Sequence, residues 1–334
     1  MNSKKIALFL TVLIMGLCLT SSTRQTTIFV IGDSTAAEKG EPDTNPERGW
    51  GMVLQGFFDE HVLIENHAVN GRSSKSFLDE GRWQVILDRI KPGDYVFIQF
   101  GHNDEKQQLD RHTEPGSTFD AHLERYVSET REKGGIPVLF SCVVRRNFYQ
   151  KVDSGIDDES LRNMSFSDEL INSDTLIDTH GAYKDVPRVV AQKMGVKFID
   201  ANRITHDLEQ SMGIAGSRKL HMWFKPNEEK SIPKGRRDNT HYNVYGARIV
   251  ARLLADAVGK EIKALQRHIV HYDYVVSKKG RGNYMSLEDA IKSIPNSKSS
   301  KIYVLDGTWT LPENVSKSQH FNLVCFPGAT VKRY

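Results

Sequence analysis

Five short runs rich in β-branched and aromatic residues constrain the fold of this chain more than any other feature. Each run has the length of one strand and is largely apolar throughout, which is typical of a parallel strand that helices cover on both faces. The runs are Thr27–Ile31, Val62–Asn66, Tyr95–Phe100, Pro137–Val144 and Val196–Asp200. The sequence therefore predicts a sheet of five buried parallel strands.

Stretches with helical periodicity separate these runs. One covers residues 83–90 and ends before the turn Pro92-Gly93, and another covers residues 122–133. The clearest is the last, whose apolar stripe consists of Val244, Ala247, Ala251, Leu254 and Val258. This alternation predicts an α/β fold, namely a three-layer α/β/α sandwich with a five-stranded parallel sheet. In such sheets the functional residues gather at the carboxyl ends of the strands.

The alternation stops after Lys260, where the composition changes. We predict a boundary near residues 260–272, with one domain over residues 24–264 and a separate segment over residues 270–334. The polar stretch Asp153–Asp178 has no strong period. We expect it to form a long excursion over the site rather than a core element.

The first residues indicate the compartment. Lys4 and Lys5 precede an apolar run, Ile6–Leu19, and a polar exit of small residues follows it. This order predicts a secretory signal peptide over residues 1–23, and hence a secreted or periplasmic protein. A membrane anchor is the alternative, but the run is shorter than the ~20 apolar residues that a spanning helix needs. Lipoprotein anchoring through Cys18 is disfavoured, since Leu17 stands where such signals usually carry a small residue.

Composition and cysteine count exclude several classes of function. The net charge is only +3, and no cluster of Lys and Arg with interleaved aromatic residues occurs, which argues against a nucleic-acid partner. Besides Cys18, the chain contains Cys142 in an apolar run and Cys325 far along the sequence. Neither a disulfide framework nor a zinc-ligand spacing follows from these positions. We therefore expect no metal and no cofactor.

Two short motifs carry residues suited to nucleophilic catalysis. Ser34 lies in Gly-Asp-Ser-Thr directly after the first strand, where a helix cap is the simpler interpretation. Asp238 and His241 lie three residues apart, just before the last helix. A serine hydroxyl needs a base to remove its proton, and a carboxylate keeps that base in one tautomer. The alternative makes Asp238 a helix cap and His241 an ordinary surface histidine.

Two further motifs follow the second and third strands. Gly71 lies in Asn-Gly-Arg-Ser, and Asn103 lies in Gly-His-Asn-Asp. A glycine leaves its N–H open to substrate, and an amide side chain at a strand's carboxyl end can donate a hydrogen bond to an oxyanion. Each motif could be a plain loop, but both stand after successive strands.

Taken in order, these four motifs resemble the conserved blocks of the SGNH (GDSL-like) hydrolase superfamily over about residues 26–260. The resemblance implies the flavodoxin-like SGNH fold and an ester hydrolase that works without a cofactor. It implies Ser34 as nucleophile, His241 as base and Asp238 as the carboxylate that orients the base. The N–H groups of Ser34 and Gly71, with the Asn103 side chain, would form the oxyanion hole.

Within the superfamily the motifs look most like those of rhamnogalacturonan acetylesterases, which implies an acetylated pectic polysaccharide as substrate. Four cations just past strand ends would meet its carboxylates: Arg72, Lys75, Arg145 and Arg146. A solvated rim is the alternative for these residues. Two other readings stay open for the chain, namely an esterase that acts on another polysaccharide, a lipid or a thioester, and a non-catalytic pectin-binding module.

The C-terminal segment resembles the opening of pectin methylesterases and other right-handed parallel β-helix proteins. The similarity lies in residues 274–284, 286–291 and 302–309. The segment stops after one or two coils, whereas a β-helix needs several stacked coils to bury its core. We therefore expect a short, incomplete β-helix-like segment without methylesterase activity. A chain of residues Thr23–Ala264 should remain active without this segment and be at least as soluble as the full chain.

Overall fold

The computed structural model describes residues 24–150, 169, 171–295, 299–311 and 321–332. The predicted signal peptide of residues 1–23 lies outside the described residues, as does most of the polar stretch 153–178. Among the described helices, none is both long and apolar enough to cross a membrane.

A five-stranded sheet forms the centre of the larger part of the molecule, the α/β domain. Its strands are β1 (Thr26–Gly32), β2 (Val62–Asn66), β3 (Tyr95–Gln99), β4 (Ile136–Phe140) and β5 (Lys197–Ile199). They are ordered β2-β1-β3-β4-β5, and every neighbouring pair is parallel. Both the predicted parallel sheet and its five strands are confirmed.

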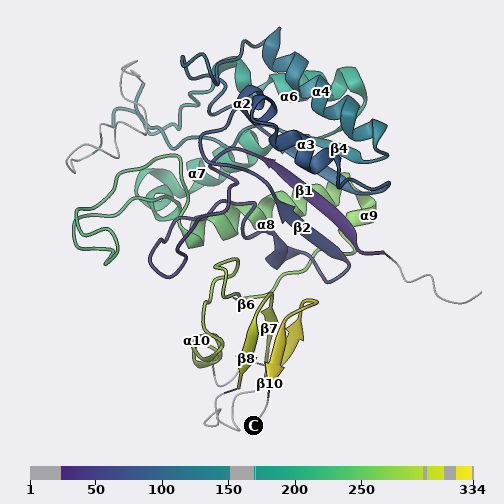
Figure 1. Ribbon diagram of the computed structural model, residues 1–334. Helices are drawn as coiled ribbons and strands as arrows, with labels where there is room; N and C mark the ends of the chain where they lie inside the picture. The colour runs from purple at the N-terminus through teal and green to yellow at the C-terminus, as the bar shows by residue number, and fades with distance from the viewer. Residues whose placement is uncertain (1–23, 151–168, 170, 296–298, 312–320, 333–334) are drawn as a thin grey trace, which may run out of the picture.

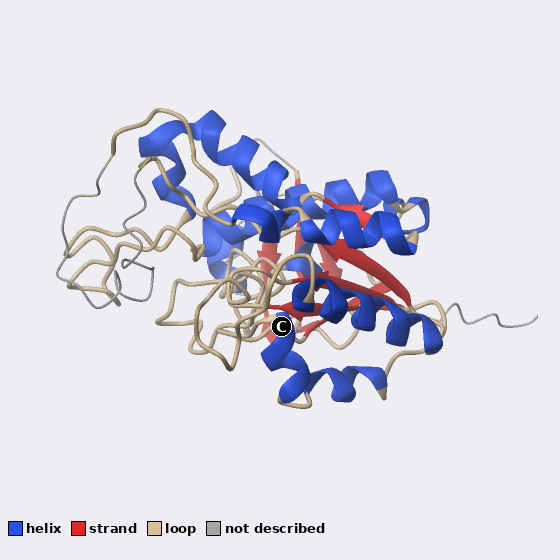
Figure 2. Cartoon of the chain, turned by 90° about the horizontal axis from the view of Figure 1, so that it is seen from above, coloured by secondary structure: helices blue, strands red, loops and turns tan. Residues whose placement is uncertain are grey.

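Helices cover both faces of this sheet (Figures 1 and 2). One face carries α2 (Ser74–Asp79), α3 (Arg82–Leu87), α4 (Thr118–Glu132) and α6 (Val186–Met194). The other carries η1 (Leu54–Phe57), α7 (Ala201–Ser217), α8 (Val244–Glu261) and α9 (Lys263–Gln266). Two short 3-10 helices, η2 (Gly181–Lys184) and η3 (Arg218–Leu220), lie in the connections. The three-layer α/β/α sandwich is confirmed.

Alternate side chains of the central strands supply the two cores. In β1, Ile28 and Val30 point into the core beneath α8, while Phe29 and Ile31 point into the core beneath α3 and α4. All four are almost completely buried. Burial of a side chain of this size stabilises the fold by about 1.5–3 kcal/mol. The face of the sheet on which each β1 side chain lies is therefore strongly specified.

The start of α8 is fixed in a way that positions the loop before it. Asn243 caps the helix by accepting a hydrogen bond from Gly246 N at 3.0 Å. A Cβ atom on Gly246 would lie 1.9 Å from Leu220 O, so only glycine allows this close approach. The preceding loop is therefore held rigidly against η3.

The described residues of the C-terminal segment form two small parallel sheets and one helix. Strands β6 (Tyr274–Val276), β7 (Ser300–Val304) and β9 (Phe321–Cys325) form one sheet, and β8 (Thr308–Thr310) and β10 (Thr330–Lys332) form the other. Helix α10 (Leu287–Lys292) packs on the first of them. Parallel pairing between successive coils is what a short β-helix-like segment requires. The resemblance to pectin methylesterases stays a prediction.

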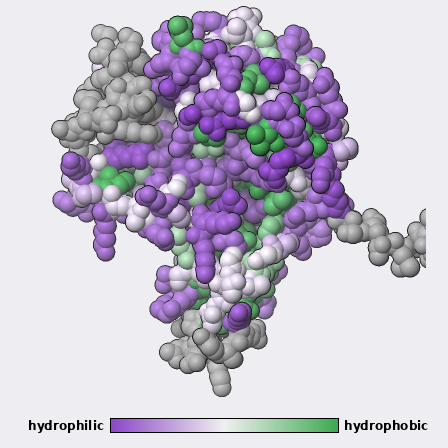
Figure 3. All heavy atoms as spheres, in the orientation of Figure 1, coloured by the Kyte–Doolittle hydropathy of each residue, from purple (hydrophilic) through white to green (hydrophobic). Residues whose placement is uncertain are grey.

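The segment packs against the α/β domain rather than standing apart from it. Val275, Tyr303, Leu305 and Phe326 form a buried cluster, and the partly buried Leu63, Val270 and Tyr272 pack against it. In Figure 3 hydrophobic side chains are more frequent around this junction, whereas the visible face of the α/β domain is mostly hydrophilic. We call this apolar contact the junction.

Polar contacts reinforce the junction, and the core of the α/β domain continues past its expected end. Tyr303 donates its hydroxyl hydrogen to Phe58 O at 3.0 Å, and Arg248 donates to Tyr272 O at 3.3 Å. Leu265 is buried in the core beneath α8, and Ile269 packs against that core. A domain that ended at residue 264 would lose both side chains.

Candidate active site

Ser34 stands at the carboxyl end of β1 on a turn that its neighbours hold firmly. The Asp33 carboxylate is fully buried and accepts hydrogen bonds from Thr35 N at 2.9 Å and Thr35 Oγ1 at 2.7 Å. Burial raises the pKa of Asp33 in spite of these bonds. A Cβ atom at Gly32 would lie 2.6 Å from Gln99 O, so the strand can approach β3 this closely only with glycine there.

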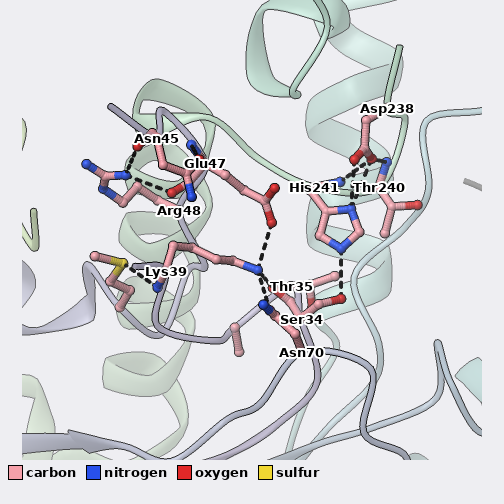
Figure 4. Close-up of polar contacts among 12 residues, drawn as sticks. Ser34, Thr35, Lys39, Asn45, Glu47, Arg48, Asn70, Asp238, Thr240 and His241 are labelled. Atoms are coloured by element: carbon pink, nitrogen blue, oxygen red, sulfur yellow. Dashed lines mark hydrogen bonds and ion pairs between the residues drawn. The ribbon is translucent and has the colours of Figure 1, made fainter. Parts of the chain in front are cut away.

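His241 joins Ser34 to Asp238 through one hydrogen-bonded chain (Figure 4). Its Nε2 lies 2.8 Å from Ser34 Oγ, and its Nδ1 lies 3.0 Å from both carboxylate oxygens of Asp238. The backbone N–H groups of Thr240 and His241 also donate to Asp238 Oδ1, at 3.0 and 2.9 Å. Because a carboxylate only accepts hydrogen bonds, it selects the tautomer with hydrogen on Nδ1 and leaves Nε2 to accept the serine proton.

Besides Ser34, the predicted oxyanion residues are Gly71 and Asn103, which lie on neighbouring loops. Gly71 has a φ of +74°, a conformation that favours glycine, and the position of a Cβ atom there meets open space. The side-chain N–H of Asn103 donates a hydrogen bond to Arg72 O at 3.1 Å. That bond ties the loop after β3 to the turn that carries Gly71.

The buried carboxylate of Asp104 also fixes the loop that carries Asn103. Asp104 is completely buried and accepts hydrogen bonds from Gly101 N at 3.1 Å, Ser74 N at 3.0 Å and Thr113 Oγ1 at 3.0 Å. Burial raises its pKa to about 7. Asp104 thereby links the Asn103 loop to the start of α2, next to the Gly71 turn.

Three of the four predicted substrate cations lie in loops or helices that follow strands, and each already has an anionic neighbour. Arg72 pairs with Glu80 at 3.0 Å, Lys75 lies 3.5 Å from Asp79, and Arg145 pairs with Glu105. The side chains of Arg72 and Lys75 are each 33% exposed. Their contact with substrate remains a prediction.

The fourth prediction, Arg146, is wrong. Its side chain is only 1% exposed and is occupied by Glu169 and by Ser217 Oγ at 2.9 Å. Its guanidinium also donates to Asn239 Oδ1 at 3.2 Å. A cation enclosed in this way cannot reach a substrate carboxylate, so Arg146 instead supports the loop that carries Asp238 and His241.

A chain of buried and partly buried charges beside the site was not foreseen from the sequence. Asp238 accepts a hydrogen bond from Arg236 at 2.6 Å, and Arg236 pairs with Glu47 at 2.8 Å. Glu47 pairs in turn with Lys39 at 2.8 Å (Figure 4). The proximity of Arg236 to Asp238 in sequence is the one signal that could have indicated part of it. Nothing local in the sequence connects Glu47 to residues almost two hundred positions later.

One group of residues in the described ranges has the geometry of metal ligands. Donor atoms of Asp59, His61 and His268 all lie within 4.8 Å of one another. The group lies just before β2, at the amino end of the sheet, whereas Ser34 follows the carboxyl end of β1. The sequence prediction of a reaction without metal does not involve this group and remains a prediction.

The model of the GDSL-like lipase/acylhydrolase family matches residues 30–249. The chain belongs to this family. The match includes Ser34, Gly71, Asn103, Asp238 and His241, and it ends inside α8, before the C-terminal segment begins. The chain is therefore an acylhydrolase whose family fold is the α/β domain.

Named relatives of this GDSL-like chain are similar over nearly their whole length. Rhamnogalacturonan acetylesterase RhgT of Bacillus subtilis is 38% identical over 243 residues, which are 73% of this chain and 94% of that protein. The probable rhamnogalacturonan acetylesterase YesY of the same organism is 32% identical over 235 residues, 69% of this chain and 91% of that protein.

A solved structure supports the fold of the same region. The crystal structure of protein YxiM from Bacillus subtilis superposes with a TM-score of 0.54 at 24% identity. The superposition covers 72% of this chain and 58% of that one.

Proposed function

We propose that this GDSL-like acylhydrolase is a serine esterase that removes acetyl groups from the rhamnogalacturonan of pectin. The observation that carries the proposal is the hydrogen-bonded chain from Ser34 Oγ through His241 to the buried carboxylate of Asp238. A helix cap or a surface histidine would not need all three groups in this order.

In the first half of the reaction, Ser34 Oγ attacks the acetyl carbonyl carbon as His241 Nε2 takes the serine proton. Asp238 holds the Nδ1–H group and stabilises the imidazolium that forms. His241 then gives the proton to the departing sugar oxygen, leaving an acetyl group on Ser34. In the second half, His241 removes a proton from water, which attacks this acyl-enzyme and releases acetate and the free serine.

The negative charge on the carbonyl oxygen needs donors that are already in place. The N–H groups of Ser34 and Gly71 and the side-chain amide of Asn103 would supply them. The hydrogen bond from Asn103 to Arg72 O supports this role, because it fixes the amide beside the Gly71 turn. Preorganised donors of this kind each contribute about 10²–10³ to the rate.

The choice of substrate rests on the similarity to RhgT and YesY and on three cationic side chains near the site. Arg72, Lys75 and Arg145 would face the galacturonate carboxylates of the polymer. A lipid ester would instead require an apolar acyl groove, whereas the residues around the site are polar.

Acetate release measured across acetylated rhamnogalacturonan, acetylated xylan, acetylated chitin and a lipid ester tests this proposal. We expect the first substrate to give the highest kcat/KM. A preference for xylan or lipid would contradict the substrate while leaving the esterase chemistry intact. If none of these substrates, nor p-nitrophenyl acetate, is hydrolysed, the chain is a binding module.

We also infer that the protein is exported. The support is the sequence pattern of residues 1–23, with its lysines followed by an apolar run. Amino-terminal sequencing of the protein from the medium or periplasm should show a start close to Thr23. A mature protein that kept Met1 would contradict export by this route.

A further inference from the structure

Two halves of the active site come from distant parts of the chain. Ser34 and Gly71 lie on loops that follow β1 and β2, whereas Asp238 and His241 lie on the loop before α8. Their relative position must be held to a few tenths of an ångström for the serine–histidine hydrogen bond to persist. The charges beside the site connect these two halves.

Lys39 positions the loops that carry Ser34 and Gly71, which we call the nucleophile side of the site. Its ammonium group donates to Ser34 O at 2.7 Å and to Asn70 Oδ1 at 2.6 Å, and its side chain is only 3% exposed. One contact fixes the backbone of the nucleophile, and the other fixes the residue that precedes Gly71. A single buried ammonium therefore positions both the serine and its neighbouring oxyanion turn.

Arg236 positions the loop that carries Asp238 and His241, which we call the acid–base side of the site. It donates to Asp238 Oδ2 at 2.6 Å, while His241 Nδ1 contacts both oxygens of the same carboxylate. The Asp238 carboxylate thus accepts hydrogen bonds from both Arg236 and His241, which hold it in its orientation toward the imidazole. Its orientation in turn fixes the imidazole that faces Ser34.

Glu47 connects the two cations. Its Oε1 lies 2.8 Å from Lys39 Nζ (Figure 4). Its Oε2 lies 2.8 Å from Arg236 Nη2. Burial alone would raise the pKa of Glu47, but the charges of Lys39, His241 and Arg236 outweigh burial and lower it to about 2. Glu47 is therefore ionised across the physiological range, and each of its oxygens binds a different half of the site.

The loop that carries Glu47 is itself anchored. Arg48 is buried and donates to Glu47 O at 2.8 Å, to Pro42 O at 2.9 Å and, across to the C-terminal segment, to Gly280 O at 2.9 Å. Arg48 N also donates to Tyr242 O at 3.0 Å, next to His241. The carboxylate of Glu47 is consequently presented by a fixed backbone.

We propose that Lys39, Glu47 and Arg236 form a positioning network that locks the nucleophile side of the active site to its acid–base side. This role rests on the proposed function, because it presumes that Ser34 and His241 react together. None of the three side chains belongs to the proposed triad or oxyanion hole, and the network acts through its contacts with Ser34, Asn70 and Asp238. Its loss should therefore lower kcat and leave KM nearly unchanged, since misplacement of reacting groups costs rate rather than ground-state binding.

Steady-state hydrolysis of p-nitrophenyl acetate by Glu47→Gln, Arg236→Gln and the double variant tests the network. We expect each single variant to lose about 10- to 100-fold in kcat with KM within about twofold. Because the residues act as a unit, the loss of kcat in the double variant should be little larger than the loss in the more impaired single variant. Folding is checked by circular dichroism, and Lys39→Gln provides the same test if Glu47→Gln does not fold.

Asp94→Asn is the matched control. Asp94 is a buried carboxylate paired with Arg24 at 2.5 Å, at the amino end of β3 and away from Ser34. We expect it to lower Tm while leaving kcat unchanged. If Glu47→Gln behaves in the same way, with a lower Tm and a full kcat, the network is merely structural and the proposal is overturned. Inactive wild-type protein would instead contradict the proposed function.

Discussion

The α/β domain and the C-terminal segment are both built on parallel strands, but they cover them differently. In the α/β domain, helices of the domain itself cover both faces of the sheet. In the C-terminal segment, Ile302 and Val304 of β7 point into the segment's own core, while Tyr303 and Leu305 point into the junction. The segment therefore uses the α/β domain as its second layer.

This difference shows where the outer face of the described coils is buried. A parallel coil normally buries its faces against further coils. Here the apolar face of β6 and β7 rests on Leu63, Val270 and Tyr272 instead. The proposed catalytic residues all come from the α/β domain, so chemistry and junction can be separated by experiment.

The largest difference between the two regions should appear on removal of the nucleophile or the base. We expect Ser34→Ala and His241→Ala to lower kcat by about 10⁴-fold or more, because nucleophile and base act as a unit. Tyr303→Phe, at the junction, should leave kcat unchanged. Initial rates on p-nitrophenyl acetate, with thermal melts as the folding check, measure both. Normal turnover in Ser34→Ala would refute the proposed triad.

Removal of an oxyanion donor should have the next largest effect. We expect Asn103→Ala to lower kcat by about 10²–10³ with little change in KM, since the donor acts on charge that develops in the transition state. Asn103→Asp is a useful companion, because it keeps the size of the side chain but places a negative charge there. A change confined to KM would make Asn103 a substrate-binding residue.

Local patterns predicted the strands and the separate motifs of Ser34 and of Asp238 with His241, because each strand and each motif depends on residues close in sequence. Val62–Asn66 matches β2 residue for residue, and the motif of Asp238 and His241 adjoins a helix with a clear apolar stripe. Whether a cation is exposed depends instead on distant partners. Arg146 stands past a strand end, as expected for a substrate contact, yet Glu169 and Asn239 enclose it.

The contacts between loops were equally beyond the sequence patterns. Glu47 has no periodic neighbours that would place it between Lys39 and Arg236. The apolar residues of the C-terminal segment predicted strands, but not that Tyr303 would bind Phe58 O. These features require the three-dimensional path of the chain, which periodicity does not encode.

Truncation tests whether the regions are separable. The sequence predicted that a chain of Thr23–Ala264 remains active and at least as soluble as the full chain. The structure revises the expected solubility. Such a chain lacks Leu265 and Ile269 and exposes the junction. We expect its soluble fraction to keep kcat within about tenfold, with a lower Tm and more aggregation than a chain ending at residue 273. Equal solubility of the two truncated chains would contradict the extended core.

Acid should destabilise the α/β domain through Glu47. Its folded-state pKa is about 2, below the ordinary 4.5, so its contribution is present above pH 4.5 and is lost as the pH falls towards 2. The shift corresponds to about 3 kcal/mol. Urea unfolding at pH 5 and pH 3 should show the wild type losing more stability than Glu47→Gln. Parallel losses in both proteins would assign the acid sensitivity to other groups.

Metal removal should have the smallest effect and bears directly on the boundary between the regions. Asp59 and His61 precede β2, and His268 lies in the connection that leads to the C-terminal segment. An ion held there would tie the connection to the α/β domain without approaching Ser34, so excess EDTA should leave kcat unchanged. A fall in Tm with EDTA that is absent in His61→Ala would show that an ion stabilises the connection. Loss of turnover with EDTA, restored by a divalent cation, would instead contradict a mechanism that uses only Ser34, His241 and Asp238.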